Sequence, residues 1–511
     1  MPGMIIVHSQ HYPKTQGELH DMGELWARTG CAVLIIERPG YGERVETTPW
    51  HRQSYASRFT FTKQLFLVGE SYSGWAAWDV IRSVDLLYER PEIDRDRVIV
   101  LGSVAGGGEP AAVAAALDPR ISAVVPFNYD QGHIRVHGDS PGQIIKQFHP
   151  WLVAASVAPR RFVRAFEFGW EGAEEADYPD LWVDGLLRSQ KVWDFYGARE
   201  NLAVSQAYGL IRLSMERVSH CFSIGPQQRV ELYPIFRRWF NIPFPSAEDL
   251  NILPDSELSV SPAREAARRQ EAQRRRPHDD LLSISPAVSV ELARQKLHQI
   301  AHGMGMEQLR AARARRQALS PEKRRLSLRE DLRAKLGDIE PAPSPKRQSF
   351  WTRSLPGAEV EAISLDVEDG ISVPLLLIRP SGGRPSRVVV AVAHEGKERF
   401  LWDRAGSLEA LLRAGVAVCL PDVRGTGETS PGADRGDGGP HHSLAQMEFD
   451  LGNSLLGSRL KDLRAVLAYL RSRPDINPQR IALWGDSFAP PNPGDLFLDE
   501  LQLEGGPQIQ Y

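Results

Sequence analysis

Cysteine is scarce in this sequence: among 511 residues only Cys31, Cys221 and Cys419 occur. They lie far apart in the chain, so they form neither a disulfide framework nor a Cys-x-x-Cys zinc ligand pair. The His and acidic residues show no metal-ligand spacing, and the glycines at 106–108 do not continue into the Lys-Ser/Thr of a phosphate-binding loop. We therefore expect no metal and no cofactor.

An excess of charge of one sign and long apolar runs are also absent. The 61 basic and 65 acidic residues give a formal charge of -4, too small to attract nucleic acid or an anionic membrane. No apolar run reaches the roughly 18 residues that span a bilayer, and no signal peptide is visible. We expect neither a nucleic-acid nor a membrane partner, whereas the cell compartment and the oligomeric state stay open.

The composition that remains, 42% hydrophobic and 25% charged, is ordinary for a soluble globular protein. Residues 1–245 alternate continuously apolar runs with helical patterns at 17–29 and 75–90. Apolar strands separated by helices predict a mainly parallel sheet covered on both faces, which is an α/β fold. The strands are expected at 4–8, 32–37, 97–102, 121–127, 161–168 and 202–208.

The composition changes in residues 246–349. Counted to residue 350, this stretch holds 20 basic and 15 acidic residues, a local balance of +5, with prolines that interrupt it repeatedly. Its most basic part, 310–335, spreads the charges all around a helix and has few aromatic residues between them. This pattern favours a charged, helical, solvated connector over a nucleic-acid site, which needs a basic stripe with stacking rings.

A second α/β unit is expected in residues 350–511, with a helix at 455–473. It repeats the first unit: residues 27–43 resemble 412–428, and residues 90–94 resemble 473–477. Its strands are expected at 363–367, 375–378, 388–393, 416–420 and 481–485.

The segment Gly485-Asp486-Ser487-Phe488 has the pattern of a nucleophile elbow, in which a strand turns sharply toward a helix. Such a turn lifts the Ser487 hydroxyl clear of the sheet, and the next backbone N–H, that of Phe488, donates to the oxyanion. The backbone near Glu395, directly after an earlier apolar strand, is where the second donor is expected. The sequence therefore predicts serine acyl-transfer chemistry at this edge.

On these motifs, both units resemble the α/β-hydrolase fold, and in particular its acetylxylan esterase and related carboxylesterase branch. The likeness covers most of residues 1–245 and 350–500. It implies a triad in the chain order serine, acid, histidine, with ester or acyl-carbohydrate substrates. In the first unit it is carried by His8-Ser9, Gly40 to Glu43, Trp75 to Asp85, Gly106 to Gly108, Leu117 to Ile121 and His220.

The first unit departs from that pattern at its own elbow. When the first unit is aligned with its relatives on the glycines at 106–108, the nucleophile position is Ala105. When it is aligned without gaps with the second unit, that position is Val104. Neither side chain can attack a carbonyl, and Ser103 comes one or two residues too early. The resemblance implies His220 as the base and Glu167 as the acid, with Glu171 as the next choice.

Ser71 is an alternative nucleophile in the first unit. Gly69-Glu70-Ser71-Tyr72 resembles the signature of serine carboxypeptidases, and the order Ser71, Glu167, His220 would complete a triad. The spacing argues against it, because Arg38 to Ser71 spans 33 residues and the corresponding Arg424 to Ser487 spans 63. The helical spacing of Trp75 and its neighbours instead predicts the helix before the elbow strand.

The second unit has the opposite departure. Its last histidines, His441 and His442, precede Ser487, so no later residue can act as the base. The strands that would bear the acid and the base are missing, so one sheet edge should be unpaired. Both ends of the chain therefore look truncated, and a base beyond residue 511 is expected.

Two functions follow. The first is a carboxylic-ester hydrolase, with acetylated carbohydrate as the substrate that the resemblance implies. The alternative is a non-catalytic hydrolase-fold protein that binds a carbohydrate or another partner, with Trp151, Trp170 and Trp182 as stacking surfaces or as core residues. A site that joins Ser487 to His220 across the units would need two separate sheet edges to converge.

Overall fold

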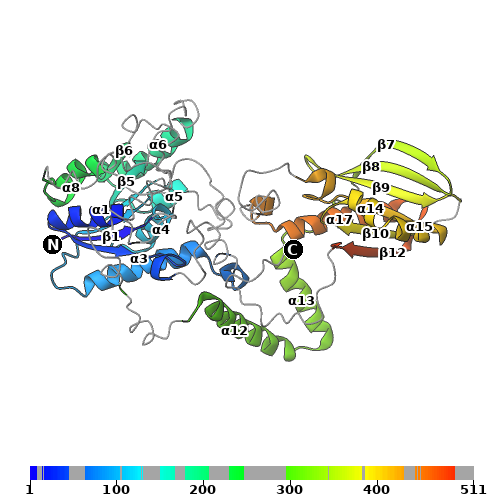
Figure 1. Cartoon of the computed structure of the whole chain (residues 1–511), viewed down its shortest axis with the longest axis horizontal. Helices are drawn as coiled ribbons and strands as arrows, with labels where there is room; N and C mark the ends of the chain where they lie inside the picture. Colours follow the sequence, from blue (N-terminus) through cyan, green and yellow to red (C-terminus); the bar gives the residue numbers. More distant parts are fainter. Residues whose placement is uncertain are drawn as a thin grey trace. The chain divides into compact units, whose positions relative to one another are not determined.

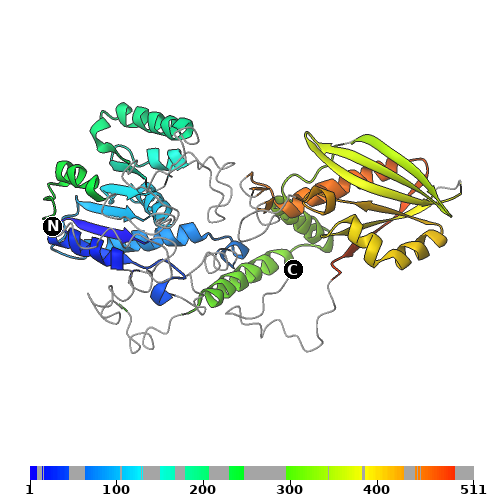
Figure 2. The ribbon, with the colours of Figure 1, turned by 45° about the horizontal axis from the view of Figure 1, so that its top comes forward.

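The computed structural model of this chain divides near residue 310 into two compact units. Figures 1 and 2 show a six-stranded sheet with helices on both sides in each unit. The structure describes residues 1–8, 14, 17–44, 62, 64–103, 106–127, 129, 150–166, 179–206, 229–246, 283, 295–342, 345–382, 386–430, 444–445, 447–448 and 451–488.

The sheet of the first unit is parallel throughout, as predicted, with the strand order β2-β1-β3-β4-β5-β6. Each strand lies within two residues of its expected ends, because continuous Val/Ile/Leu/Ala runs can only be buried on both faces. The strands are β1 (Gly3–Val7), β2 (Ala32–Ile36), β3 (Val98–Gly102), β4 (Ala123–Pro126), β5 (Arg161–Phe166) and β6 (Leu202–Gln206).

Helices cover both faces of this sheet. On one face, α1 (Gly17–Arg28) and α8 (Leu232–Phe240) pack through Trp26 and Phe236, whose ring centroids lie 5.1 Å apart. The opposite face carries α3, and Figure 1 shows α1 and α3 on either side of β1. The helices of that face are α3 (Tyr72–Tyr88), α4 (Gly108–Leu117), α5 (Pro150–Ala155) and α6 (Pro179–Phe195), with the short turns η1 (Gly42–Arg44) and η2 (Arg199–Asn201) between elements.

The sheet of the second unit is mixed, so the prediction of mainly parallel sheets is wrong there. Only β10–β11 and β10–β12 are parallel, and the other three ladders are antiparallel. Tight turns at Gly357 and Gly370, with φ values of 80° and 73°, join three strands into a meander. The order is β12-β10-β11-β9-β8-β7, with β7 (Lys346–Leu355), β8 (Ala358–Glu368), β9 (Ile371–Pro380), β10 (Ser386–Ala393), β11 (Val416–Pro421) and β12 (Ile476–Asp486).

Helices also cover both faces of the second sheet. The helix α17 (Leu455–Ser472) packs on one face, and α14 (Lys397–Asp403) and α15 (Ala405–Arg413) pack on the other. Figure 2 shows the orange α17 and the golden α14 and α15 on opposite sides of the strands. The short turn η5 (Gly427–Thr429) follows β11.

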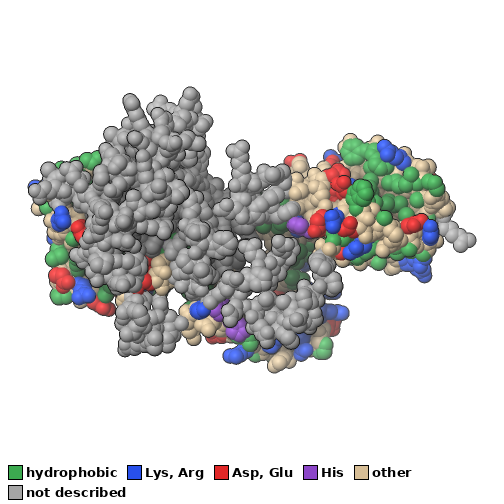
Figure 3. Space-filling view, viewed as in Figure 1, with side chains coloured by type: hydrophobic (Ala, Val, Ile, Leu, Met, Phe, Trp, Pro, Cys, Tyr) green, Lys and Arg blue, Asp and Glu red, His purple; other side chains and the backbone are tan. Residues whose placement is uncertain are grey.

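Of the expected connector, residues 246–349, the structure describes mainly the second half, which is helical up to residue 336, and its last residues belong to the second sheet, since β7 begins at Lys346. It contains α12 (Leu297–Gln317) and α13 (Pro321–Leu336). Lys and Arg side chains gather over these helices, and Leu336 is the one buried residue of α13 (Figure 3). There Ser454 Oγ donates to the Leu336 carbonyl at 3.2 Å, which ties α13 to α17. In the described part of the chain, no helix has both the length and the apolar character that a bilayer crossing requires.

Candidate active site

The two units share three parallel strands in the same arrangement. In the first unit β1 lies between β2 and β3, and in the second β10 lies between β11 and β12. Gly3 pairs with both Ala32 and Val98, while Val388 pairs with both Ala417 and Ile481. The repeat that the sequence predicts is therefore found in the topology. In each unit the candidate elbow follows the third strand, β3 or β12.

In the second unit, Ser487 directly follows β12 and is exposed. The register pairs Ala393 with Asp486, the last residues of β10 and β12, and His394 and Ser487 are the residues that directly follow these two parallel strands. Within the described residues β12 pairs only with β10, and its Leu483 side chain is 62% exposed. This agrees with the expected unpaired edge beside the serine.

The turn at Ser487 is held by the carboxylate of Asp486. Arg404 donates to Asp486 through Nε at 2.7 Å and through Nη2 at 3.2 Å. These bonds, with the backbone N–H of Phe488 at 2.9 Å from Oδ1, hold the pKa of Asp486 below its usual value. The Phe488 N–H is the predicted oxyanion donor, and that role stays a prediction that requires this N–H to turn away from Asp486.

Aromatic packing supports the same turn from α14. Phe400 is fully buried, and its ring centroid lies 5.2 Å from that of Trp484 and 5.1 Å from that of Phe488. The Arg404 guanidinium lies 5.1 Å from the Phe488 ring centroid. Phe488 has a φ of 53°, a left-handed conformation that an aromatic residue rarely adopts. The packing from α14 therefore holds a strained residue directly after the serine.

The loop after β10 carries Glu395, the expected site of the second oxyanion donor. Glu395 is exposed, and the loop then turns at Gly396 with a φ of 86°. The next residue, Lys397, donates to Asp422 through its backbone N–H at 2.7 Å and through Nζ at 2.6 Å. Asp422 also accepts the Glu428 N–H at 3.0 Å. The loop is thus fixed to the carboxyl end of β11, the strand beside β10.

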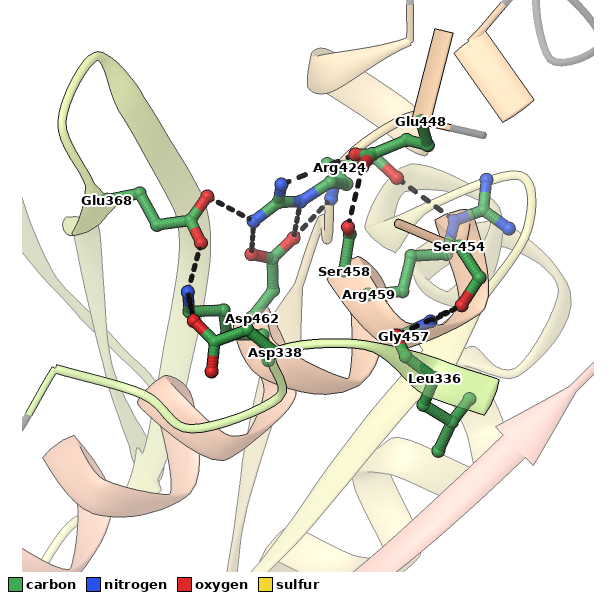
Figure 4. Close-up of polar contacts among 11 residues, drawn as sticks. Leu336, Asp338, Glu368, Arg424, Glu448, Ser454, Gly457, Ser458, Arg459 and Asp462 are labelled. Atoms are coloured by element: carbon green, nitrogen blue, oxygen red, sulfur yellow. Dashed lines mark hydrogen bonds and ion pairs between the residues drawn. The ribbon is translucent and has the colours of Figure 1, made fainter. Parts of the chain in front are cut away.

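Arg424, two residues beyond Asp422, is the centre of a buried polar network (Figure 4). It donates to the fully buried Asp462 on α17, with Nη2 2.7 Å from Oδ1 and the backbone N 2.9 Å from Oδ2. The same Nη2 lies 3.2 Å from Glu368, and Glu448 accepts a bond from Ser458. Burial alone would lower the pKa of Arg424, but the bonds to Asp462 raise it above its usual value. Arg424 is therefore a fixed structural cation that anchors this loop.

In the first unit, the turn between β3 and α4 is closely packed. A Cβ on Gly107 would lie 2.3 Å from the Val7 carbonyl oxygen, so only glycine fits. Ser103 is fully buried, its N–H donates to Val7 at 2.8 Å, and its Oγ has no hydrogen-bond partner in the described part of the chain. Positions 104 and 105, where the nucleophile would stand, lie outside the described residues.

His8 and Arg38 brace this turn from the ends of β1 and β2. The backbone N–H of Arg38 donates to His8 Nε2 at 3.1 Å, and Arg38 Nη1 donates to the Gly106 carbonyl at 2.9 Å. Both side chains are buried. Of the His8-Ser9 motif, His8 therefore orients Arg38, which in turn binds the described end of the turn at Gly106.

Ser71 is the N-cap of α3, where its Oγ accepts the Gly74 N–H at 3.0 Å. A helical stretch and a turn precede it in the described residues, whereas an elbow serine follows a strand. This arrangement matches the expected helix before the elbow strand and gives no support to Ser71 as the nucleophile. The other predicted members of a triad, Glu167, Glu171 and His220, lie outside the described residues, as do His441 and His442.

Sequence reasoning missed the residues that support the serine turn and its neighbouring loop. These are Lys397, Phe400 and Arg404, which recur at spacings of three and four residues and so share one side of the helical stretch after β10. That periodicity was the available signal. Among the described residues, no group of three or more His, Cys, Asp or Glu side chains is placed to hold a metal ion.

The fold and the strand-to-turn position of Ser487 define the class as α/β-hydrolase-like. Residues 1–133 match the family described as acetyl xylan esterase (AXE1), so the first unit is similar to these esterases. A search of curated proteins finds no significant match.

Several solved esterase structures are similar to the chain. The methylesterase BT1017 is 19% identical over 50% of this chain and 53% of its own, with a TM-score of 0.36. Acetyl xylan esterase 1 from Thermoanaerobacterium sp. is 17% identical over 28% of this chain and 45% of its own, with a TM-score of 0.23. A glucuronoyl esterase from Solibacter usitatus is 15% identical over 46% of this chain and 73% of its own, with a TM-score of 0.30. The chain thus spans about half the length of the first two, and likenesses of this size add no argument about function.

Proposed function

We propose that this protein is a carboxylic-ester hydrolase of the acetyl xylan esterase type, with Ser487 as its nucleophile and acetylated carbohydrate as its substrate class. The observation that carries the class is the match of residues 1–133 to the acetyl xylan esterase family. The choice of Ser487 is supported by its exposed position at the carboxyl end of a parallel strand, beside the loop that contains Glu395.

In the proposed reaction, Ser487 Oγ attacks the ester carbonyl carbon and gives its proton to a histidine. The negative charge on the carbonyl oxygen is stabilised by the backbone N–H groups of Phe488 and Glu395. The alcohol leaves with the proton, and water then hydrolyses the acyl-enzyme by the same steps. The candidate base within the second unit is His394, which directly follows β10, the strand that pairs with β12.

The nucleophile is tested by the rate of acetate release from a short acyl ester and from acetylated xylan. We expect Ser487→Ala to lower kcat by a factor on the order of 10³ or more, because the attacking group is lost. The control Ser71→Ala should keep the wild-type rate, since that hydroxyl caps a helix. Loss of activity in Ser71→Ala alone would overturn the assignment. Binding of acetylated xylan oligosaccharide without any turnover would support the non-catalytic alternative instead.

The base is tested with His394→Ala. If His394 accepts the proton of Ser487, its removal should lower kcat by about 10²–10⁴-fold, the usual contribution of a general base. Activity that survives this substitution would show that His394 is not the base.

A further inference from the structure

The contact between Lys397 and Asp422 has a counterpart in the first unit. There Glu37, at the end of β2, accepts the Lys14 N–H on Oε1 at 3.1 Å and the Glu43 N–H on Oε2 at 2.9 Å. Lys14 and Glu43 also form an ion pair. In the second unit Lys397 Nζ lies 2.7 Å from Glu428 Oε1. Each unit thus uses one acid at a strand end to join a lysine-bearing loop to a Gly-Glu turn.

The two arrangements differ in where the lysine comes from. From Gly3 and Val388, which hold the same place in the two strand pairings, to the segments 27–43 and 412–428, the repeat has an offset of 385 residues. Asp422 and Glu37 share this offset (422 − 37), but Lys397 and Lys14 are 383 apart (397 − 14). The lysines are therefore not at matching positions of the repeat. The two units make this contact with lysines at different positions of the repeat. This indicates that the loop after β1 and the loop after β10 each have to be held to the end of the neighbouring strand.

The contact between Lys397 and Asp422 in the second unit is buried and closely packed. Lys397 is 8% exposed and Asp422 is 1% exposed, so the ion pair lies in a region of low dielectric where it is strong. A Cβ on Gly396 would lie 2.4 Å from the Gly427 Cα, so the two loops touch through their backbones. The loop that carries Glu395 consequently has little freedom to shift relative to the end of β11.

We propose that Lys397 and Asp422 are positioning residues: they hold the loop so that the backbone N–H of Glu395 faces the oxyanion that forms at Ser487. This rests on the proposed function of Ser487. Oxyanion donors act only when they are fixed at about 2.7–3.1 Å from the developing charge, and loss of one donor typically lowers kcat by about 10²–10³. A loosened loop therefore reduces the stabilisation of the transition state more than it reduces the affinity for the substrate.

The test uses the full chain with Lys397→Met, which keeps the aliphatic stem and removes the ammonium group. We expect kcat for a short acyl ester to fall by about 10- to 100-fold with KM within about threefold. Lys397→Arg should recover part of the rate because it restores the charge. The matched control is Lys14→Met in the unit whose elbow lacks a serine at 104 and 105. It removes the Lys14–Glu43 ion pair, the counterpart of Lys397–Glu428, and it should keep the wild-type kcat.

Hydrogen exchange measured by mass spectrometry supplies a readout that does not depend on turnover. In Lys397→Met the peptide 394–400 should exchange faster than in the wild type, and in Lys14→Met it should not. An unchanged kcat in Lys397→Met, an equal loss in both Met variants, or unchanged exchange at 394–400 would each overturn the positioning role. Absence of Ser487-dependent turnover in the wild type would instead refute the proposed function. The exchange comparison would still test whether Lys397 holds the loop to Asp422.

Discussion

At the scale of single residues, burial sets the chemistry of the cysteines. Cys31 lies in the core beside α1, and Cys419 lies on β11 in the middle of the second sheet. Burial raises the pKa of Cys31 to about 11 and that of Cys419 to about 12, because a thiolate would lose its hydration. Both thiols therefore stay protonated, and so unreactive, at neutral pH.

We expect a thiol reagent such as DTNB, at pH 8, to label at most one of the three cysteines of the native chain within minutes. Cys221 lies outside the described residues and is the one left to react. Denatured protein should give all three thiols, which serves as the control. Rapid native labelling that peptide mapping assigns to Cys31 or Cys419 would contradict the burial argument.

The serine turn shows at the same scale how a charged side chain can fix a backbone. Arg404 holds Asp486, and Asp486 accepts the N–H of Phe488, so the orientation of that N–H depends on a residue 82 positions away from Asp486. The motif Gly-Asp-Ser locates the turn in the sequence. It does not say that Asp486 will accept the next N–H, because Asp486 is held in place by Arg404, at the junction of α14 and α15.

At the scale of elements, the turn η5 depends on glycine. Gly427 has a φ of 46°, and a Cβ there would lie 2.3 Å from Asp422 Oδ2. Gly415, between α15 and β11, also has a positive φ, 73°, but a Cβ there would meet nothing within 4 Å. The two glycines therefore share the backbone requirement and differ in packing.

We expect Gly415→Ala to destabilise the second unit by about 1 kcal/mol, the cost of a left-handed alanine. Gly427→Ala should cost about 1–3 kcal/mol more, because its methyl group collides with the carboxylate that anchors Lys397. Urea unfolding followed by circular dichroism measures both changes in the free energy of unfolding. Equal values for the two variants would show that the collision is relieved by movement of Asp422.

Most elements could be predicted from the sequence, and the reason is local. Strands such as β1 and β3 are continuously apolar, and α17 has an apolar stripe of helical period, so burial alone defines them. The meander β7-β8-β9 was the main failure. Its strands run antiparallel because of the turns at Gly357 and Gly370, and the first strand, β7, is exposed along its length, so hydrophobicity gives no signal for it.

At the scale of the whole molecule, the hydrophobic clusters that the described residues form on the two faces of each sheet lie within one compact unit or the other. Phe236 on α8 and Phe400 on α14 are fully buried, one in each unit. Domains with separate cores generally unfold as separate cooperative units. The two sheets should therefore melt independently.

Calorimetry of the full chain should show two transitions. Because Phe→Ala in a core costs about 3–5 kcal/mol, Phe236→Ala should lower the midpoint of one transition and Phe400→Ala that of the other. Each variant is the control for its counterpart. A single transition that moves with both substitutions would show that the units unfold together.

The sequence by itself determined where the apolar strands lie, that one unit repeats the other, and that Ser487 follows a strand at a turn, because local patterns of apolar residues and glycine specify these features. Only the tertiary structure decided that β7 to β9 form an antiparallel meander, that Asp486 takes the N–H of Phe488, and that lysines at unmatched positions fix corresponding loops. Those outcomes depend on which distant side chains the folded chain brings within a few ångströms, and no local pattern specifies that.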